Sequence, residues 1–494
     1  MTKTNAHSSL DLRAMARRAM IENGFEPDMP PAVELEMQAM EGKQPKDHVD
    51  DDPPPRDLRA LLWSSIDNHD SRDLDQVEFA EELPGGDIRL LIGIADVDAL
   101  VPKGSAIDRH ALHNTTSIYT GVRTFPMLPE ELSTHTTSLL EDEDRLAVVI
   151  ELVVDAEGEV RSNEVYRARV RNQAKLVYEQ VGAWLEGRAP APSKVSEVAG
   201  LVEQLRLQDK ATERLRALRK RNGALNLQTI EAKAVVVDGR VVELVASEHN
   251  RARDIIESFM VAANTEMAEF LETAGWPSIR RVVRTPERWP RIAEIARSFG
   301  DSLPEEPDSR ALNSFLSRRR AADPVHFPDL SLSIVKLMGP GEYVVERAGT
   351  EGEGHFGLAV HDYTHSTAPN RRYPDLITQR VLKAVVARRP SPYTEAELWD
   401  IAERCTERED AARKVERLMR KASAAVLLGE RIGDTFDAIV TGVSAKGTFV
   451  RLIAPPAEGR VMRGEQGMDV GDRVRVKLLA TEPERGFIDF ARAS

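Results

Sequence analysis

The sequence predicts a multidomain α+β protein, in which a small N-terminal helical module precedes a large mixed α/β domain and a C-terminal all-β barrel. Three observations support this prediction. The chain has 494 residues, more than one ordinary hydrophobic core organises. Helical and strand-like patterns are mixed between residues 56 and 390. From residue 432 onward, apolar residues recur with a period of two, and glycines separate short segments.

Residues 1–50 are predicted to form the helical module, with two helices within residues 9–42. Apolar side chains recur at helical spacing at Leu12, Met15, Ala16, Ala19 and Met20. Ser9 is a candidate N-cap of the first helix, and the pair Pro30 and Pro31 can open the second. Such a short unit could be a helix-turn-helix module or a helical arm packed on the main domain, and both alternatives stay open. The acidic, proline-rich residues 46–57 then predict an exposed linker.

The large domain, residues 56–390, combines strand and helix patterns. Two apolar runs are typical of strands, DIRLLIGIADV and RLAVVIELVVDAEGEV, and the second contains a turn. Two amphipathic patterns predict helices. These are VSEVAGLVEQLRLQDKATERLRALRKR, expected as one long helix, and RDIIESFMVAANTEMAEFLETAG, which ends at Gly275. AKAVVVDGRVVELVA predicts a hairpin around Asp238 and Gly239.

The C-terminal part divides into a charged helical connector, residues 391–431, and an all-β segment, residues 432–494. Five short strands with glycine turns are predicted within DTFDAIVTGVSAKGTFVRLI, EGRV and GDRVRVKLLATEPERGFIDFA. Five such strands are typical of a small closed OB-type barrel, in which Phe436 is expected to be a core residue.

The composition is that of a globular, soluble protein, with 41% hydrophobic and 30% charged residues. The net charge of −14 argues against nucleic acid as a partner, but the charge is distributed unevenly and the acidic surplus need not face a ligand. Cys405 is the only cysteine, which excludes an intrachain disulfide and a cysteine-rich metal site. No apolar run is long enough for a signal peptide or a membrane span, so a cytoplasmic protein is expected.

The stretch SIDNHDSRDLDQ carries four aspartates, Asp67, Asp70, Asp73 and Asp75. Carboxylates this close repel one another, so the segment must either lie open to water or hold a cation. Their oxygens are hard ligands, and irregular loops of this kind bind magnesium, manganese or calcium. An EF-hand fits poorly because Arg72 stands where that loop requires glycine. Magnesium would point to phosphodiester chemistry, whereas a solvated acidic loop is the alternative.

Longer motifs follow one another along the rest of the chain. They include PPRDLRALLWSSID, IGIADVDALVPKGSAIDRHA, TSIYTGVRTFPMLPEELST, RDIIESFMVAAN and HFGLAVHDYTHSTAPNRRYPDLITQRVLKAVV. In order and spacing they resemble the catalytic RNB domain of the ribonuclease II family, and the terminal barrel resembles an S1-type OB fold. The resemblance covers residues 56–494. It implies a 3′-to-5′ exoribonuclease that releases nucleoside 5′-monophosphates by a two-metal mechanism with Mg²⁺, or with Mn²⁺ in its place.

The resemblance assigns the aspartate cluster to metal binding. Asp67, Asp73 and Asp75 match the family aspartates that hold magnesium and the scissile phosphate, and Asp75 is expected to be catalytic. The family pattern D-I-D-D ends here in Gln76, so the last acidic ligand is missing, and an amide oxygen donates less charge to a metal. That Asp70 partly substitutes for this ligand is a hypothesis.

Two arginines in TAPNRRYPD also follow from the resemblance. Arg371 matches the catalytic arginine that stabilises charge at phosphorus, a task that suits the guanidinium fork. Arg372 is expected to bind RNA, and an ion pair that holds the loop is the alternative.

Further residues are expected to contact RNA. Tyr119 matches the tyrosine that stacks on the terminal base, and Leu227 replaces the phenylalanine that often faces it. Tyr178 and Glu257 match residues that contact ribose hydroxyls, which distinguish RNA from DNA. In the barrel, RNA contact is expected from Lys446, Phe449 and Arg451.

Four other polar residues are expected to be structural. His355 and His361 lie six positions apart without a third ligand at metal-site spacing. Asp96 and Asp98 follow a predicted strand, where a turn or a fold-stabilising role is expected.

Family members commonly carry two cold-shock domains ahead of the catalytic domain, and 55 residues cannot hold them. We therefore expect a chain without these domains, a more open entrance, and greater tolerance of RNA duplex near the 3′ end. The expected partner is single-stranded or 3′-tailed RNA, bound by a monomer. Two other functions stay open, a catalytically weakened RNA-binding protein of the same fold and a DNA exonuclease.

Overall fold

The structure is a computed structural model that describes residues 11–40, 53–228, 232–237, 240–246, 249–350 and 352–493. The expected cap Ser9, most of the expected linker and the expected turn at Asp238 and Gly239 lie outside the described residues. In the part that is described, no helix is both long and apolar enough to cross a lipid bilayer.

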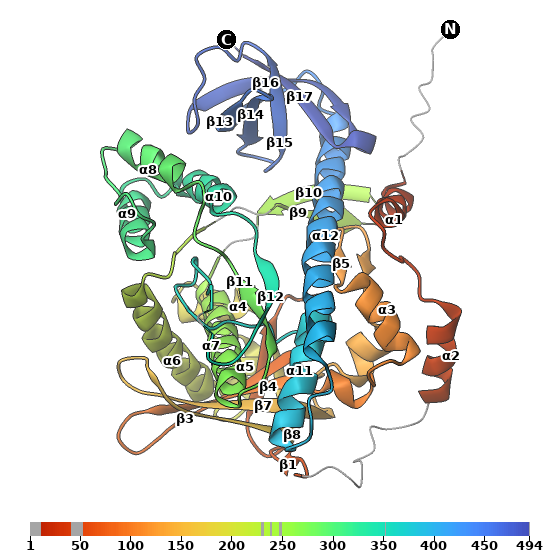
Figure 1. The fold of residues 1–494 in the computed structure, drawn as a ribbon. Coiled ribbons are helices and arrows are strands. Elements are labelled where there is room, and N and C mark those ends of the chain that lie inside the picture. Colours follow the sequence, from red (N-terminus) through yellow and green to blue (C-terminus); the bar gives the residue numbers. More distant parts are fainter. Residues whose placement is uncertain are drawn as a thin grey trace.

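The two N-terminal helices, α1 (Leu12–Glu22) and α2 (Pro31–Met40), pack on different parts of the molecule. Asp11 caps α1 by accepting hydrogen bonds from the next backbone amides. The apolar face of α1 packs on α12 (Glu395–Gly429), and α2 packs on α3 (Ala106–Asn114) (Figure 1). Both helices thus pack on the rest of the described chain, as a helical arm would, and a helix-turn-helix role stays a prediction.

The main sheet has the order β1-β8-β2-β3-β4-β7, and β7 also pairs with β8. Its strands are β1 (Arg56–Asp57), β2 (Trp63–Asp67), β3 (Gln76–Glu82), β4 (Ile88–Ala95), β7 (Asp144–Val154) and β8 (Val160–Val177). The β2 strand runs parallel to β8 and antiparallel to β3. The chain between β2 and β3 is the aspartate-rich segment, so it is an irregular loop between neighbouring strands, as predicted.

Three helices pack on this sheet, α4 (Tyr178–Leu185), α6 (Leu201–Asn222) and α11 (Tyr373–Val386). The helix α7 (Arg251–Thr273) packs on all three of them. The prediction of one continuous helix over residues 195–221 is wrong. Gly200 adopts φ +84°, a left-handed conformation that interrupts helical geometry, and it separates α5 (Ser193–Glu197) from α6.

The smaller elements lie around this core (Figure 1). They are α8 (Trp289–Ser298), α9 (Ser309–Ala322), α10 (Phe327–Met338) and the strand pairs β5 (Ile118–Tyr119) with β6 (Thr124–Phe125), β9 (Ala232–Val237) with β10 (Arg240–Ala246), and β11 (Ser278–Val282) with β12 (Glu342–Glu346). The antiparallel pairing of β9 with β10 confirms the predicted hairpin.

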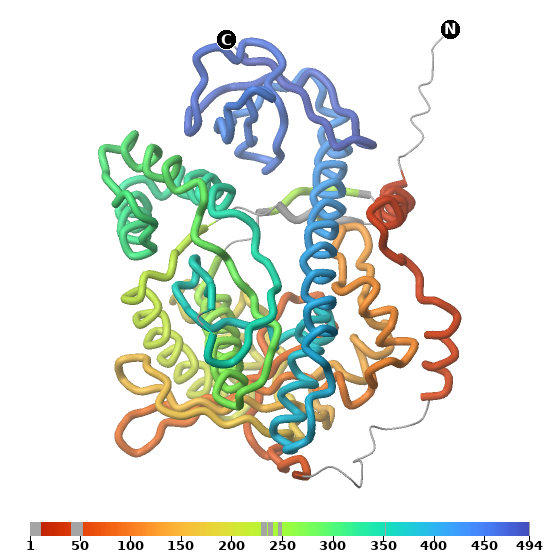
Figure 2. The backbone as a smooth tube through the Cα atoms, viewed as in Figure 1, coloured from red at the N-terminus to blue at the C-terminus, as the bar shows by residue number. Residues whose placement is uncertain are grey.

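The helix α12 begins with a capping box formed by Thr394 and Glu397, and it runs from the main domain to the C-terminal barrel (Figure 2). The barrel closes in the order β13-β14-β15-β17-β16, which confirms the predicted five strands. They are β13 (Thr435–Ser444), β14 (Gly447–Leu452), β15 (Glu458–Arg463), β16 (Arg473–Glu482) and β17 (Phe487–Arg492). Phe436 is buried in the barrel core, as expected.

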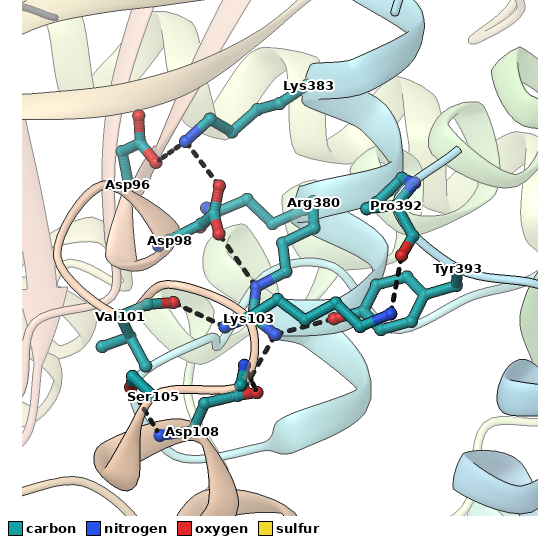
Figure 3. Close-up of polar contacts among 12 residues, drawn as sticks. Asp96, Asp98, Val101, Lys103, Ser105, Asp108, Arg380, Lys383, Pro392 and Tyr393 are labelled. Carbon is teal, nitrogen blue, oxygen red and sulfur yellow. Dashed lines mark hydrogen bonds and ion pairs between the residues drawn. The ribbon is translucent and has the colours of Figure 1, made fainter. Parts of the chain in front are cut away.

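A buried charge network joins α11 to the end of β4 (Figure 3). The Arg380 guanidinium donates to Asp98 Oδ1 and Asp108 Oδ1, both at 2.8 Å. Lys383 Nζ donates to Asp96 at 2.7 Å and to Asp98 at 2.9 Å. Asp96 and Asp98 therefore have the fold-stabilising role that the sequence analysis expected. Because α11 follows Arg371 directly, the network also fixes the position of that arginine.

The substitution Arg380→Met tests this anchoring. It leaves Asp108, whose side chain is 6% exposed, without its guanidinium partner. Removing one partner of a buried ion pair costs about 3–5 kcal/mol, so we expect the free energy of unfolding in urea to fall by that amount. Lys103→Met breaks a pair with Glu397 that is 38% and 44% exposed, and we expect a loss below about 1 kcal/mol. Equal losses in the two variants would contradict the anchoring role.

Candidate active site

The loop between β2 and β3 forms one wall of a cavity of about 280 Å³. Three of its aspartates, Asp67, Asp73 and Asp75, line this cavity together with Gln76. Asp70 is exposed on the same loop and is not among the lining residues. The structure therefore brings three of the four aspartates together and leaves Asp70 outside.

Side chains from distant parts of the sequence complete the cavity. Tyr119 comes from β5, Tyr178 from the start of α4, Arg253 from α7 and Arg371 from the turn before α11. The Tyr119 hydroxyl donates to Asp73 Oδ2 at 3.0 Å. Arg371 Nε donates to Asp75 Oδ2 at 3.3 Å. The backbone amide of Asn370 donates to Asp75 Oδ1 at 3.1 Å.

The aspartates of the cavity are not a solvated acidic loop. Asp75 is only 2% exposed, and burial raises the pKa of its carboxyl to about 7, although the Arg371 charge acts in the opposite direction. Burial also raises the pKa of Asp67, although hydrogen bonds from the Ser71 hydroxyl and the Asn68 amide lower it. Two acids whose charged forms are poorly solvated thus share one cavity.

This donor set fits a divalent cation. Three carboxylates supply hard oxygen ligands, and Arg371 is the arginine that contacts one of them. Their oxygens do not form a compact triad. A different group is compact in this sense. Within the described ranges, one ligand atom each of His249, Asp254 and Glu257 lies within 4.8 Å of the other two.

That second group is a poor metal site. His249 Nε2 lies 2.6 Å from Asp254 Oδ1, and this hydrogen bond raises the pKa of the imidazole, which favours its protonated form. Arg216 also pairs with Asp254. The Asp254 carboxylate is thus already engaged by two basic side chains, which a metal would have to displace. The aspartate cavity is therefore the candidate metal centre.

Two residues expected to contact ribose lie in different places. Tyr178 lines the aspartate cavity, with the Arg253 guanidinium 4.3 Å from the centre of its ring. Glu257 does not line this cavity. It lines a larger cavity of about 760 Å³, which Leu227 also lines. Both roles in RNA binding stay predictions.

Three other expected RNA contacts have different surroundings. Arg372 Nη2 donates to Asp375 at 2.7 Å, an ion pair of the kind that the alternative expected, and its contact with RNA stays a prediction. Arg451 was also expected to contact RNA, and this stays a prediction. It is 8% exposed and pairs with Asp329 of α10 at 2.9 Å, which joins the barrel to the main domain. Phe449 is half-buried on β14, and its contact with RNA stays a prediction.

His355 is structural, as expected. Its Nδ1 accepts a hydrogen bond from the Leu358 amide at 3.1 Å, and burial lowers the pKa of its imidazole to about 4.

The sequence analysis missed Arg253. This side chain lines the cavity on the same face of α7 as Ile256 and Met260, which follow it by three and seven positions. Its Nη2 also donates to Asn68 Oδ1 of the aspartate loop at 3.2 Å. Helical spacing could have identified this face, but the sequence does not say that the face meets the loop.

Comparisons with known proteins show which domains the chain resembles. The sequence profile of the RNB domain matches residues 55–388, and that of the RNase II-type exonuclease C-terminal S1 domain matches residues 434–493. Ribonuclease R 1 of Lactococcus lactis is 30% identical over 466 residues, which are 88% of this chain and 56% of that protein. Ribonuclease R of Thermotoga maritima is 29% identical over 468 residues, 88% of this chain and 64% of that protein.

The chain thus spans about half to two thirds of the length of these curated relatives. Among solved structures, Mycoplasma genitalium RNase R in complex with ribose methylated single-stranded RNA is similar in fold. Its TM-score is 0.86 at 23% identity, and the match covers 98% of this chain and 78% of that one.

The raised pKa of Asp75 predicts a pH-dependent effect of Asp75→Asn on the metal-free protein. Below about pH 4 the carboxyl is protonated in the folded and unfolded states, so it contributes no difference. Between that pH and the folded pKa of about 7, only the unfolded state ionises, and the wild type loses stability as pH rises. Above the folded pKa the loss is complete, because both states are then ionised. The variant cannot ionise and avoids this loss.

Urea unfolding in the presence of a chelator, at about pH 4 and about pH 8, measures the effect. The variant should be more stable than the wild type at the higher pH and similar to it at the lower. A constant difference at both pH values would show that the Asp75 carboxyl does not titrate as its burial implies.

Proposed function

The chain belongs to the RNB-domain family of the ribonuclease II type, and from this premise we propose that it is a 3′-to-5′ exoribonuclease that hydrolyses RNA to nucleoside 5′-monophosphates. One observation carries the proposal. Three aspartates, two tyrosine rings and two guanidinium groups, brought together from distant parts of the sequence, line the same cavity. These are the groups that a metal-assisted phosphodiesterase needs.

Asp67, Asp73 and Asp75 would hold the divalent ions, which we propose to be two Mg²⁺, with Mn²⁺ able to replace them. When bound, such ions supply positive charge to the phosphate and lower the pKa of water. The carboxylates are already held in place by donors from the protein, Tyr119 to Asp73 and Ser71 to Asp67. The cavity is thus organised before a ligand enters it.

Arg371 would stabilise charge at phosphorus. Its Nε contacts Asp75, while 44% of its side chain stays exposed, so the rest of the guanidinium can reach a phosphate. Arg253 provides a second cation in the same cavity, and we propose that it contacts a neighbouring phosphate.

Tyr119 would stack on the 3′-terminal base. Tyr119 is 44% exposed, its hydroxyl is held by Asp73, and its backbone amide donates to Glu416 at 3.0 Å. A ring fixed at both ends offers a flat surface to any base. Tyr178 and Glu257 would distinguish ribose from deoxyribose, and Phe449 of the barrel would guide the strand. A monomeric state and a cytoplasmic location belong to the same proposal.

Product analysis on 3′-tailed RNA with a 5′ label tests the function. We expect Mg²⁺-dependent shortening by one nucleotide at a time, release of 5′-monophosphates, and no reaction with a chelator. Asp75→Asn should abolish cleavage and retain binding. Arg371→Ala should lower kcat by about 10²–10³-fold, because it removes charge stabilisation at the reacting phosphate.

DNA of the same sequence is the control, and it should not be shortened. Degradation of both polymers at similar rates would favour a DNA exonuclease. RNA that is bound but stays intact with Mg²⁺ would favour the catalytically weakened RNA-binding protein, a function suggested by the neutral Gln76 in the cavity.

We also propose that the chain tolerates RNA duplex near the 3′ end. A hairpin with a short 3′ overhang should then be degraded into its stem. The length of the final product, compared with that from an unstructured RNA, measures this. A stop many nucleotides before the stem would contradict it.

A further inference from the structure

Glu78 is a buried carboxyl that the proposed mechanism does not use. It lies on β3, opposite Ser64 of β2, and it is 0% exposed. Neither of its carboxylate oxygens has a hydrogen-bond partner. Among the ion pairs of the described residues, none includes Glu78. A buried acid with no donor and no cation is costly in a folded protein.

The position of Glu78 connects it with the metal centre. Side chains two residues apart on a strand point to the same face, so Glu78 shares a face of β3 with Gln76. Gln76 lines the aspartate cavity and stands where the pattern D-I-D-D has an acid. The chain therefore lacks one carboxylate at the cavity and carries an additional one at the next position on the same face.

Electrostatic interactions agree with this position. Burial raises the pKa of Glu78 well above its usual value, and the charge of Asp67 raises it further. The pKa of Tyr178 is raised by burial and then by the charges of Asp67 and Glu78. Glu78 thus lies near Asp67 and Tyr178, which line the cavity, although Glu78 is buried and is not itself a lining residue.

We propose that Glu78 is the fourth carboxylate of the metal centre and supplies the negative charge that Gln76 lacks. This inference rests on the proposed function, because it requires that the three aspartates bind divalent ions. Bound cations would also give the Glu78 oxygens the partner that the protein does not provide. Whether these oxygens reach an ion directly or act through an intervening water, the predicted effect is on metal affinity.

The alternative is a protonated carboxyl with a packing role only. Ser64 Oγ and Gln208 Oε1 are also buried without a partner, and either could accept a hydrogen bond from a neutral Glu78. In that case, the isosteric change Glu78→Gln would keep a donor in place and leave metal binding unchanged.

The experiment is a titration of the full-length chain with Mn²⁺, followed by electron paramagnetic resonance. Four proteins are compared, the wild type, Glu78→Gln, the double variant Gln76→Asp/Glu78→Gln and the control Glu266→Gln. Glu266 is a suitable control because it is another buried carboxyl, 8% exposed, and it bonds to Asn163 outside the cavity. Circular dichroism melting reports on folding, and cleavage of 3′-tailed RNA by the wild type reports on the proposed function.

We expect Glu78→Gln to weaken Mn²⁺ binding about 10–100-fold, the range found when groups around metal ligands are removed. The double variant, which returns a carboxylate to position 76, should recover most of this affinity, and Glu266→Gln should bind like the wild type. Recovery would also show that the loss comes from charge and not from misfolding.

Unchanged affinity in Glu78→Gln, or a loss that the double variant does not recover, would overturn the inference. If the wild type cleaves RNA and binds Mn²⁺ in that case, the proposed function stands and only the role of Glu78 fails. If the wild type neither binds Mn²⁺ nor cleaves RNA, the proposed function itself fails.

Discussion

Repulsion between carboxylates around one water-poor cavity is the constraint on which the rest of this structure depends. Asp67 and Asp75 both have raised pKa values because burial disfavours their charged forms. The protein does not neutralise them with a matching set of cations. It supplies donors, including the Tyr119 hydroxyl and the amide before Arg371, which orient the oxygens and leave a surplus of negative charge. Such a surplus is reduced by protonation, as the raised pKa of Asp75 indicates, or by a ligand that brings positive charge.

The charge network at α11 shows what the same fold does with acids that have a structural role. Asp96 pairs with Lys383 and Arg167, and Asp108 pairs with Arg380. These buried acids contact cations of the protein itself, so their charge is balanced without a ligand. The structural acids near α11 thus have matching cations, whereas the aspartates of the cavity do not have a full set. The same network holds Arg371 in position beside the aspartates, because it fixes the helix α11, which follows this arginine, to the end of β4.

The sequence predicted much of this architecture but not all of its contacts. The period of two after residue 432 and the strand patterns around the aspartates depend on local side-chain alternation, and the structure confirms both. The break at Gly200 was missed because helical periodicity continues on both sides of it. The pairing of Arg451 with Asp329, and the approach of Arg253 to the aspartate loop, join distant segments. Local patterns carry no information about such contacts.

The neutral residue at position 76 shows why a metal centre is better judged by its total charge than by one motif position. A strand directs every second side chain to the same face, so an acid at position 78 can act on the space that position 76 adjoins. The glutamate side chain is also one methylene longer than that of aspartate. The field of a buried carboxylate extends over several ångströms because little water screens it. If Glu78 supplies negative charge as proposed, a departure from D-I-D-D is not by itself a sign of decay, since a carboxyl lies one step further along the same face.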